Sequence, residues 1–279
     1  MFYSDLLYNN FMSKKYYFLS GFFRSGNTVL SAILNQNPSI HSSPISSLVE
    51  HIWQSHLISE NFQSSKANKE DKEKSKFLTS KMIDLYYQNI DKPIIFDRSK
   101  VWIDQDNIEL IKEYINKNPK IIFTTRPFIE TAVSFIAIEK NRINEQMNNS
   151  NFIQNKSISI NDNIVDYLFS DFNEFSTNMK FALEAIDNPD NADIIHVVKY
   201  EDLLNESQKT MNNIYDFLKI KRYNHDFNNI QQIDQYNDSL IGFSNNLHKV
   251  RKNLSRSSLK VEDFLSIDCI EKYKNVRYF

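Results

Sequence analysis

Four short, largely apolar runs divide the chain, and stretches with helical periodicity lie between them. The runs cover residues 16–20, 93–97, 120–124 and 193–199. Each run is continuously apolar rather than alternating, which is typical of a strand covered on both faces in a parallel sheet. Strands that alternate with helices imply right-handed crossovers, so the pattern predicts an α/β fold: a three-layer sandwich with a central parallel sheet.

The helical stretches differ in how much of their surface is apolar. Between residues 165 and 186 apolar side chains recur at steps of three and four, which predicts one helix face packed on the core. Residues 205–218 repeat this pattern. The stretch 64–76 is rich in Lys and Glu and predicts a solvated helix or a mobile flap. The stretch 141–163 is rich in Asn and Ser and predicts a loop that faces the substrate.

Two of the three glycines of the chain, Gly21 and Gly26, bracket a loop between the first apolar run and a helical pattern. Glycine permits positive φ and a close approach of backbone to ligand. The start of the next helix adds free N–H groups and a positive dipole end, which suits a phosphate. A nucleotide-hydrolysing P-loop has Lys directly after its second glycine, where this chain has Asn27. The loop cation is Arg24 instead.

Polar residues also follow the other three predicted strands. They are the segment 97–100, Arg126 and Tyr200. In an open parallel sheet, ligands bind outside the carboxyl ends of the strands. We therefore expect these residues and the glycine loop to meet in one site.

The loop from Gly21 to Thr28, continuing to Asn37 and Pro38, resembles the 5′-phosphosulfate loop of sulfotransferases. This family has a P-loop-like fold and uses 3′-phosphoadenosine-5′-phosphosulfate (PAPS). The family often has Pro just before the loop cation, where this chain has Phe23, so the loop is expected to be held differently. The resemblance implies that the 5′-phosphate is bound by Gly21, Arg24, Ser25, Gly26, Asn27 and Thr28.

Three later segments resemble the family in the same order along the chain. Arg126 and Ser134 resemble the 3′-phosphate-binding pair, and that phosphate distinguishes PAPS from ATP. Tyr200 resembles the strand-end Tyr near the adenosine. Arg251 and Lys252 lie in a basic run that resembles the late loop closing the nucleotide site in this family. The resemblance implies that both residues also bind the 3′-phosphate.

The resemblance implies transfer of a sulfuryl group to an acceptor hydroxyl, or less readily an amine. Arg24 would neutralise the leaving phosphate, and Arg98 would stabilise the bridging oxygen. A hydroxyl acceptor needs a general base, and the residues that relatives place after the first helix or the next strand are missing here. Asp97 is the leading candidate, followed by His41 and Glu50. No metal is expected, because no convincing ligand spacing is present.

Composition sets broad limits. The chain has 279 residues and a formal net charge of −2, which gives no support for nucleic-acid binding. The single cysteine, Cys269, excludes an intrachain disulfide framework and fits a reducing compartment. No membrane span or signal peptide is predicted, so a cytoplasmic location is expected. Because the site residues are spread along the chain, residues 1–279 are expected to form one domain, with 64–76 and 141–163 as insertions.

Two other functions remain open at the level of sequence. One is a P-loop kinase-like phosphotransferase, in which Asp97 would bind magnesium; Asn27 in place of Lys counts against it. The other is a non-catalytic nucleotide-binding relative, because the usual base residues are missing. The acceptor is equally open: a small molecule, glycan, lipid or peptide. The sequence does not fix the oligomeric state.

Overall fold

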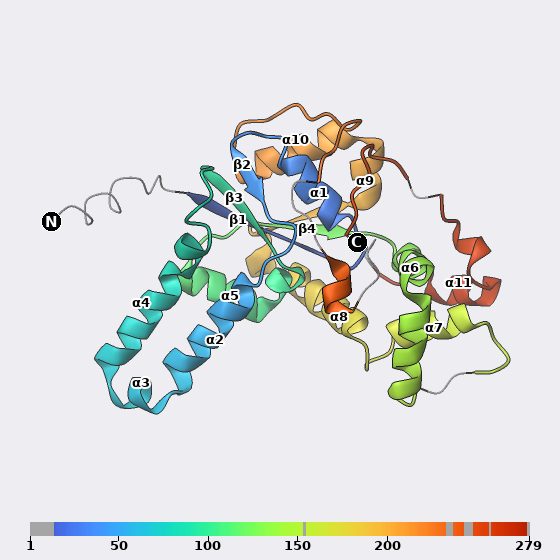
Figure 1. Cartoon of the computed structure of the whole chain (residues 1–279), viewed down its shortest axis with the longest axis horizontal. Coiled ribbons are helices and arrows are strands. Elements are labelled where there is room, and N and C mark those ends of the chain that lie inside the picture. Colours follow the sequence, from blue (N-terminus) through green and yellow to red (C-terminus); the bar gives the residue numbers. More distant parts are fainter. Residues whose placement is uncertain (1–13, 153–154, 233–236, 243–247, 257, 278–279) are drawn as a thin grey trace.

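The computed structural model describes residues 14–152, 155–232, 237–242, 248–256 and 258–277. Five parallel strands form one sheet in the order β2-β3-β1-β4-β5 (Figure 1). The strands are β1 (Lys15–Gly21), β2 (Ile40–Ser42), β3 (Ile94–Arg98), β4 (Ile121–Thr125) and β5 (Ile195–Lys199).

Helices cover both faces of this sheet, which confirms the predicted α/β sandwich (Figure 1). None of the helices within the described ranges is long and apolar enough to cross a membrane. The α-helices are α1 (Asn27–Leu34), α2 (Leu48–Asn61), α3 (Gln63–Ala67), α4 (Lys69–Tyr86), α5 (Gln105–Tyr114), α6 (Phe128–Asn149), α7 (Ile160–Leu168), α8 (Glu174–Asp187), α9 (Tyr200–Asn205), α10 (Ser207–Leu218) and α11 (Ile267–Tyr273). The short 3-10 helices are η1 (Lys100–Ile103), η2 (Pro189–Asn191), η3 (Asp238–Ile241) and η4 (Val261–Asp263).

All four predicted strands are present, within two residues of their predicted ends. The edge strand β2 was not predicted. It has three residues, Ile40, His41 and Ser42, and among the described strands it pairs with β3 alone. So short a segment carries no periodic signal of its own, and its pairing with β3 defines it as a strand.

The core divides into two clusters, one on each face of the sheet. Along β1, Tyr17 and Leu19 join a cluster with α1, α9 and α10, whereas Phe18 joins the larger cluster with α2, α5 and α6. Successive side chains of a strand point to opposite faces. A strand that buries both faces must therefore be apolar throughout, as its sequence shows.

The prediction of one continuous helix face between residues 165 and 186 is wrong in one respect: the structure has two helices here, α7 and α8. The chain turns between them, and the Asn173 side chain accepts a hydrogen bond from Phe175 N at the start of α8. Phe172, which the periodicity assigned to the core, is 86% exposed. The local cap at Asn173 therefore outweighs the continuing apolar period.

The loop predicted for 141–163 is also wrong at both ends. Helix α6 continues to Asn149, and α7 begins at Ile160. Ile143 and Met147 are buried, four residues apart on the face of α6 that packs on the core. The weak helix propensity of Asn costs little compared with this burial.

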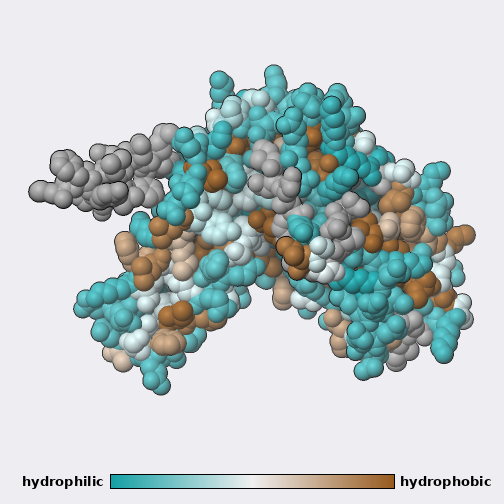
Figure 2. All heavy atoms as spheres, in the orientation of Figure 1, coloured by the Kyte–Doolittle hydropathy of each residue, from teal (hydrophilic) through white to brown (hydrophobic). Residues whose placement is uncertain are grey.

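The Lys- and Glu-rich stretch 64–76 is largely helical, as the first of its two predictions, a solvated helix, expected. It covers most of α3 and the first part of α4. Together α2, α3 and α4 form a helical arm that projects from the sheet (Figure 1). Figure 2 shows a hollowed face between this arm and the region of α6 and α7.

Candidate active site

The glycine loop joins β1 to α1 with two residues in the left-handed region. Arg24 has φ 56° and Gly26 has φ 95°. A Cβ on Gly26 would lie 2.7 Å from the ring of Tyr200, at the start of α9. Gly26 is thus required both by its backbone conformation and by the close approach of Tyr200.

Polar side chains behind the loop fix its shape. Ser25 is buried, and its Oγ donates to Phe22 O (2.6 Å) and lies 2.6 Å from Thr124 Oγ1. Asn27 Nδ2 also donates to Phe22 O (3.3 Å). Asn27 Oδ1 is buried and has no hydrogen-bond partner within the described part of the chain. The Asn27 amide group therefore bonds back to the loop, unlike a P-loop lysine, which extends toward the phosphates. The Ser25 hydroxyl likewise stabilises the loop and does not face the ligand side.

Two guanidinium groups converge at this loop. Arg126 Nη1 lies 3.5 Å from Arg24 O, and Arg24 Nε donates to Ser134 Oγ on α6 (3.2 Å). Burial lowers the pKa of Arg24, and the nearby charge of Arg126 lowers it further. The Arg126 charge thus disfavours the charged form of the Arg24 side chain, and a bound anion would stabilise both cations.

Arg126 is positioned by its neighbours. Its guanidinium carbon lies 4.9 Å from the ring centroid of Tyr200, a cation–π geometry. Its Nε donates to Glu130 Oε2 one turn into α6 (3.1 Å). These contacts hold the guanidinium beside the glycine loop.

A cavity of about 500 Å³ opens at the carboxyl ends of the strands. It brings together segments that are far apart in sequence: the glycine loop, the start of α2, the end of β3, α6, α9, the segment 248–255 and the pair 258–259. Of the predicted site residues, the cavity is lined by Gly21, Arg24, Gly26, Asn27, Thr28, Arg98, Arg126, Ser134, Tyr200 and Arg251, and also by the reserve base candidate Glu50.

Four predicted site residues do not line the cavity. Besides Ser25, these are Asp97, His41 and Lys252. Asp97 is 0% exposed, and burial raises its pKa, although hydrogen bonds partly offset this. His41 lies on edge strand β2 with its ring 5.9 Å from that of Tyr87. Lys252 is exposed, and its carbonyl accepts from Ile230 N (2.7 Å).

The strand order gives the cavity two halves. The loop after the central strand β1 lies in the middle. Arg126, Ser134 and Tyr200 come after β4 and β5 on one side. On the other side, the wall is formed by the end of β3 and the residue pair after it, and by the segment that leads into α2 with its first turn. These residues include Arg98, Lys100, Ile45, Ser46 and Glu50.

A histidine–aspartate pair borders the cavity and was not predicted as a functional pair. His248 lines the cavity, and its Nδ1 is hydrogen-bonded to Asp238 Oδ1. Its backbone N donates to Asp238 Oδ2 (3.1 Å), and Asp238 is 1% exposed. Burial lowers the pKa of His248, against the opposing effect of Asp238. The sequence offered no signal for this pairing, because His248 lies within a basic run and Asp238 in a polar one.

Two further features lie apart from this site. Among residues with described placement, His56, Glu60 and Glu113 form one group with ligand atoms within 4.8 Å of one another. Lys76 pairs with both glutamates, at 3.3 Å and 2.6 Å, so a cation already neutralises the group. None of these residues lines the cavity described above.

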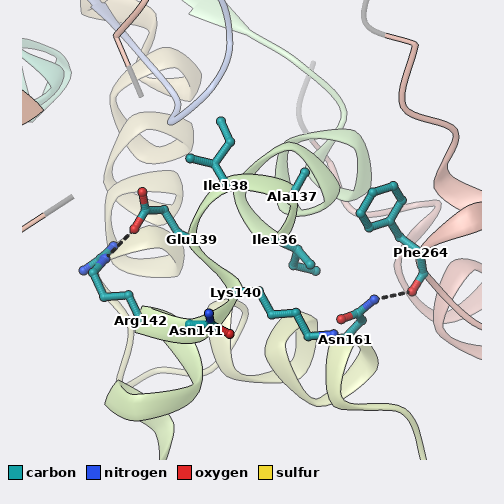
Figure 3. Close-up of a pocket in the computed structure, with 9 residues that line it drawn as sticks. All are labelled: Ile136, Ala137, Ile138, Glu139, Lys140, Asn141, Arg142, Asn161 and Phe264. Atoms are coloured by element: carbon teal, nitrogen blue, oxygen red, sulfur yellow. Dashed lines mark hydrogen bonds and ion pairs between the residues drawn. The ribbon is translucent and has the colours of Figure 1, made fainter. Parts of the chain in front are cut away.

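A second cavity, also of about 500 Å³, lies along α6. Figure 3 shows its wall, where Asn161 donates to Phe264 O (2.9 Å) and Arg142 pairs with Glu139 (3.0 Å). Ile138 lines both cavities, so they adjoin at this residue of α6.

Comparisons with known proteins agree with this arrangement. A family model described as "Sulfotransferase family" matches residues 17–225. No curated protein matches the chain. Among solved structures, the chain is similar to the "Sulfotransferase Domain from the Curacin Biosynthetic Pathway", with 15% identity, 95% of this chain and 91% of that chain covered, and a TM-score of 0.50. At this identity the likeness is one of fold.

A second solved structure is the "Sulfotransferase Domain from the Synechococcus PCC 7002 Olefin Synthase". Its identity to this chain is 14%, the match covers 95% of this chain and 96% of that chain, and the TM-score is 0.47.

Proposed function

Because this chain belongs to the sulfotransferase family, we propose that it transfers a sulfuryl group from PAPS to an acceptor hydroxyl. The observation that carries the proposal is the convergence of Arg24 and Arg126 at the glycine loop: the Arg126 guanidinium donates to the backbone carbonyl of Arg24 (3.5 Å), and its charge lowers the pKa of the Arg24 side chain. One molecule with phosphates at both ends would occupy the two groups together.

The residues present fit such a donor. The N-terminus of α1 and Arg24 would hold the 5′-phosphate, as helix N-termini do. Arg126 and Ser134 would hold the 3′-phosphate, with Arg251 from the segment above. Tyr200 would lie beside the adenosine. These residues span much of the chain, which is why we treat it as one domain.

The donor supplies an activated sulfuryl group, and the protein positions the reactants and stabilises charge. Arg24 would stabilise negative charge that develops on the leaving phosphate. Arg98, at the end of β3, would stabilise the transferring group from the other side. No step here requires a metal.

We propose His248 as the general base. Asp238 holds Nδ1, so that the neutral ring presents Nε2 as the proton acceptor. The acceptor hydroxyl would lose its proton to Nε2 as its oxygen bonds to sulfur and the bond from sulfur to the bridging oxygen breaks, which releases adenosine 3′,5′-bisphosphate. The buried Asp238 carboxylate would stabilise the resulting imidazolium. A pKa lowered by burial keeps His248 neutral at physiological pH. This assignment replaces Asp97 and His41, which lie outside the cavity lining.

The test is ligand preference followed by transfer. Adenosine 3′,5′-bisphosphate should raise the melting temperature of the protein more than ATP with magnesium does. The second step is transfer of ³⁵S from labelled PAPS to a panel of phenols, alcohols and sugars. Preferential stabilisation by ATP would instead support the phosphotransferase alternative. Stabilisation by the bisphosphate without transfer or sulfate release would support a non-catalytic relative.

A further inference from the structure

Asp97 lies directly before the cavity-lining Arg98, yet its carboxylate is fully buried. Consecutive strand residues point to opposite faces, so Arg98 faces the cavity and Asp97 points away from it. Three neutral groups donate to the Asp97 carboxylate: Ser46 Oγ to Oδ2 (2.6 Å), Trp102 Nε1 to Oδ1 (2.6 Å), and the Tyr87 hydroxyl to Oδ2.

Of these three donors, only Ser46 lines the cavity. Its Oγ also accepts from Leu48 N (3.1 Å), and its own N donates to Arg98 O (2.9 Å). Arg98 additionally donates to the Pro44 carbonyl. Two adjacent residues of β3 thus hold the segment 44–48 through separate hydrogen bonds.

This segment begins helix α2, whose first turn places Glu50 on the same cavity wall. The other side of the network reaches the helix of the glycine loop. The Tyr87 hydroxyl lies 2.7 Å from Ser43 Oγ, and Ser31 Oγ of α1 donates to Ser43 O (2.9 Å). The buried carboxylate therefore lies within a hydrogen-bond network that joins the donor loop to the opposite wall.

We propose that Asp97 is a positioning residue, whose carboxylate fixes Ser46 and the first turn of α2 as the wall against which the acceptor is placed. The inference rests on the proposed function. A carboxylate in an apolar interior costs free energy unless it is well hydrogen-bonded. The three donors satisfy both oxygens of Asp97, and the bond from Ser46 Oγ (2.6 Å) fixes the Ser46 side chain at the cavity wall.

The kinetic test uses Asp97→Asn, which keeps the shape but replaces one accepting oxygen by an NH₂ group, and Ser46→Ala, which removes the donor. With the acceptor identified from the panel above, each variant should raise the acceptor KM about tenfold. Stabilisation by adenosine 3′,5′-bisphosphate should stay at the wild-type value. The double variant should be no worse than the more severe single one, because both remove one interaction. Ser46→Thr, which restores a hydroxyl, should recover most of the loss.

Trp102→Phe is the matched control. It removes another buried donor from Asp97, at Oδ1 rather than at the Oδ2 that Ser46 binds, and Trp102 does not line the cavity. It should lower the melting temperature without changing the acceptor KM. If Trp102→Phe and Asp97→Asn raise KM equally, or if Asp97→Asn leaves KM unchanged, Asp97 has only a general structural role and the proposal is overturned.

Hydrogen exchange gives a readout that needs no acceptor. Amides of residues 45–50 should exchange faster in Asp97→Asn and Ser46→Ala than in the wild type, and at the wild-type rate in Trp102→Phe. Unchanged exchange at 45–50 in Asp97→Asn would overturn the proposal. A different result would contradict the proposed function: no stabilisation of the wild-type protein by adenosine 3′,5′-bisphosphate.

Discussion

At the residue scale, Arg24 is the residue whose loss should reduce the reaction rate most. It is buried beside a second guanidinium, and it alone supplies a cation from within the glycine loop. Arg24→Ala should reduce kcat by about 100- to 1000-fold, the usual cost of removing a group that stabilises transition-state charge. Turnover of labelled PAPS measures this. Arg222→Ala is the control, because Arg222 pairs with Asp216 on the surface and should leave turnover unchanged. Equal turnover in Arg24→Ala and the wild type would remove Arg24 from the mechanism.

His248 should give the reaction a characteristic pH dependence. Because burial lowers its pKa, kcat/KM should rise with pH along a limb whose apparent pKa lies below 6.5, the ordinary value for histidine. His248→Gln should lose this limb as well as most of the rate. His51→Gln, an exposed histidine on α2, should keep it. A limb that persists in His248→Gln would assign the base elsewhere, with Glu50 as the next candidate.

A different histidine should set part of the acid sensitivity of folding. His225 stacks on Tyr215, and burial lowers its pKa to about 4. Between pH 6.5 and about 4 the unfolded chain therefore binds more protons at this residue, so its contribution to stability falls as the pH falls. Urea midpoints of wild type and His225→Gln should converge as the pH is lowered from 7 to 4.5. A constant difference between them would contradict the assignment.

At the scale of elements, the turn from β1 into α1 depends on one backbone conformation. Gly26→Ala should cost about 1–2 kcal/mol for the left-handed conformation, and it also places a methyl group 2.7 Å from the Tyr200 ring. Binding of adenosine 3′,5′-bisphosphate should therefore weaken, as measured by calorimetry. Gly242 offers a control: its φ is 78°, and no atom of the described residues would lie within 4 Å of an added Cβ. Gly242→Ala should lower the free energy of unfolding but leave the affinity for adenosine 3′,5′-bisphosphate unchanged. Equal affinity in both variants would show that Tyr200 does not contact the nucleotide.

Helices were less predictable than strands. A run such as Ile121–Phe123 is buried on both faces, so its sequence is apolar whatever surrounds it. The end of α6 depends on whether Ile143 and Met147 find a core to pack on, which local composition does not reveal. The break at Asn173 depends on a single side-chain cap. Propensity is therefore a weak guide where tertiary burial or one hydrogen bond decides.

At the scale of the whole molecule, the proposed nucleotide site joins β1, β4, α9 and the segment 248–255. Ligand that binds only the folded chain stabilises it by mass action, by about 2.7 kcal/mol at 100 times Kd. Adenosine 3′,5′-bisphosphate should therefore raise the melting temperature and also slow hydrogen exchange at 248–255. Arg126→Ala should reduce both effects. Stabilisation without protection at 248–255 would indicate that this segment does not contact the ligand.

The sequence by itself determined the α/β class, the glycine loop and the residues at the strand ends, because a doubly covered parallel strand must be apolar and a tight anion-binding turn must contain glycine. Tertiary structure decided which polar residues reach the cavity. Asp97 and Arg98 are neighbours in sequence, but the alternation of a strand places one in the core and the other in the site. His248 and Asp238 became a pair only when the chain folded around them. Such pairings depend on long-range packing, which no local pattern records.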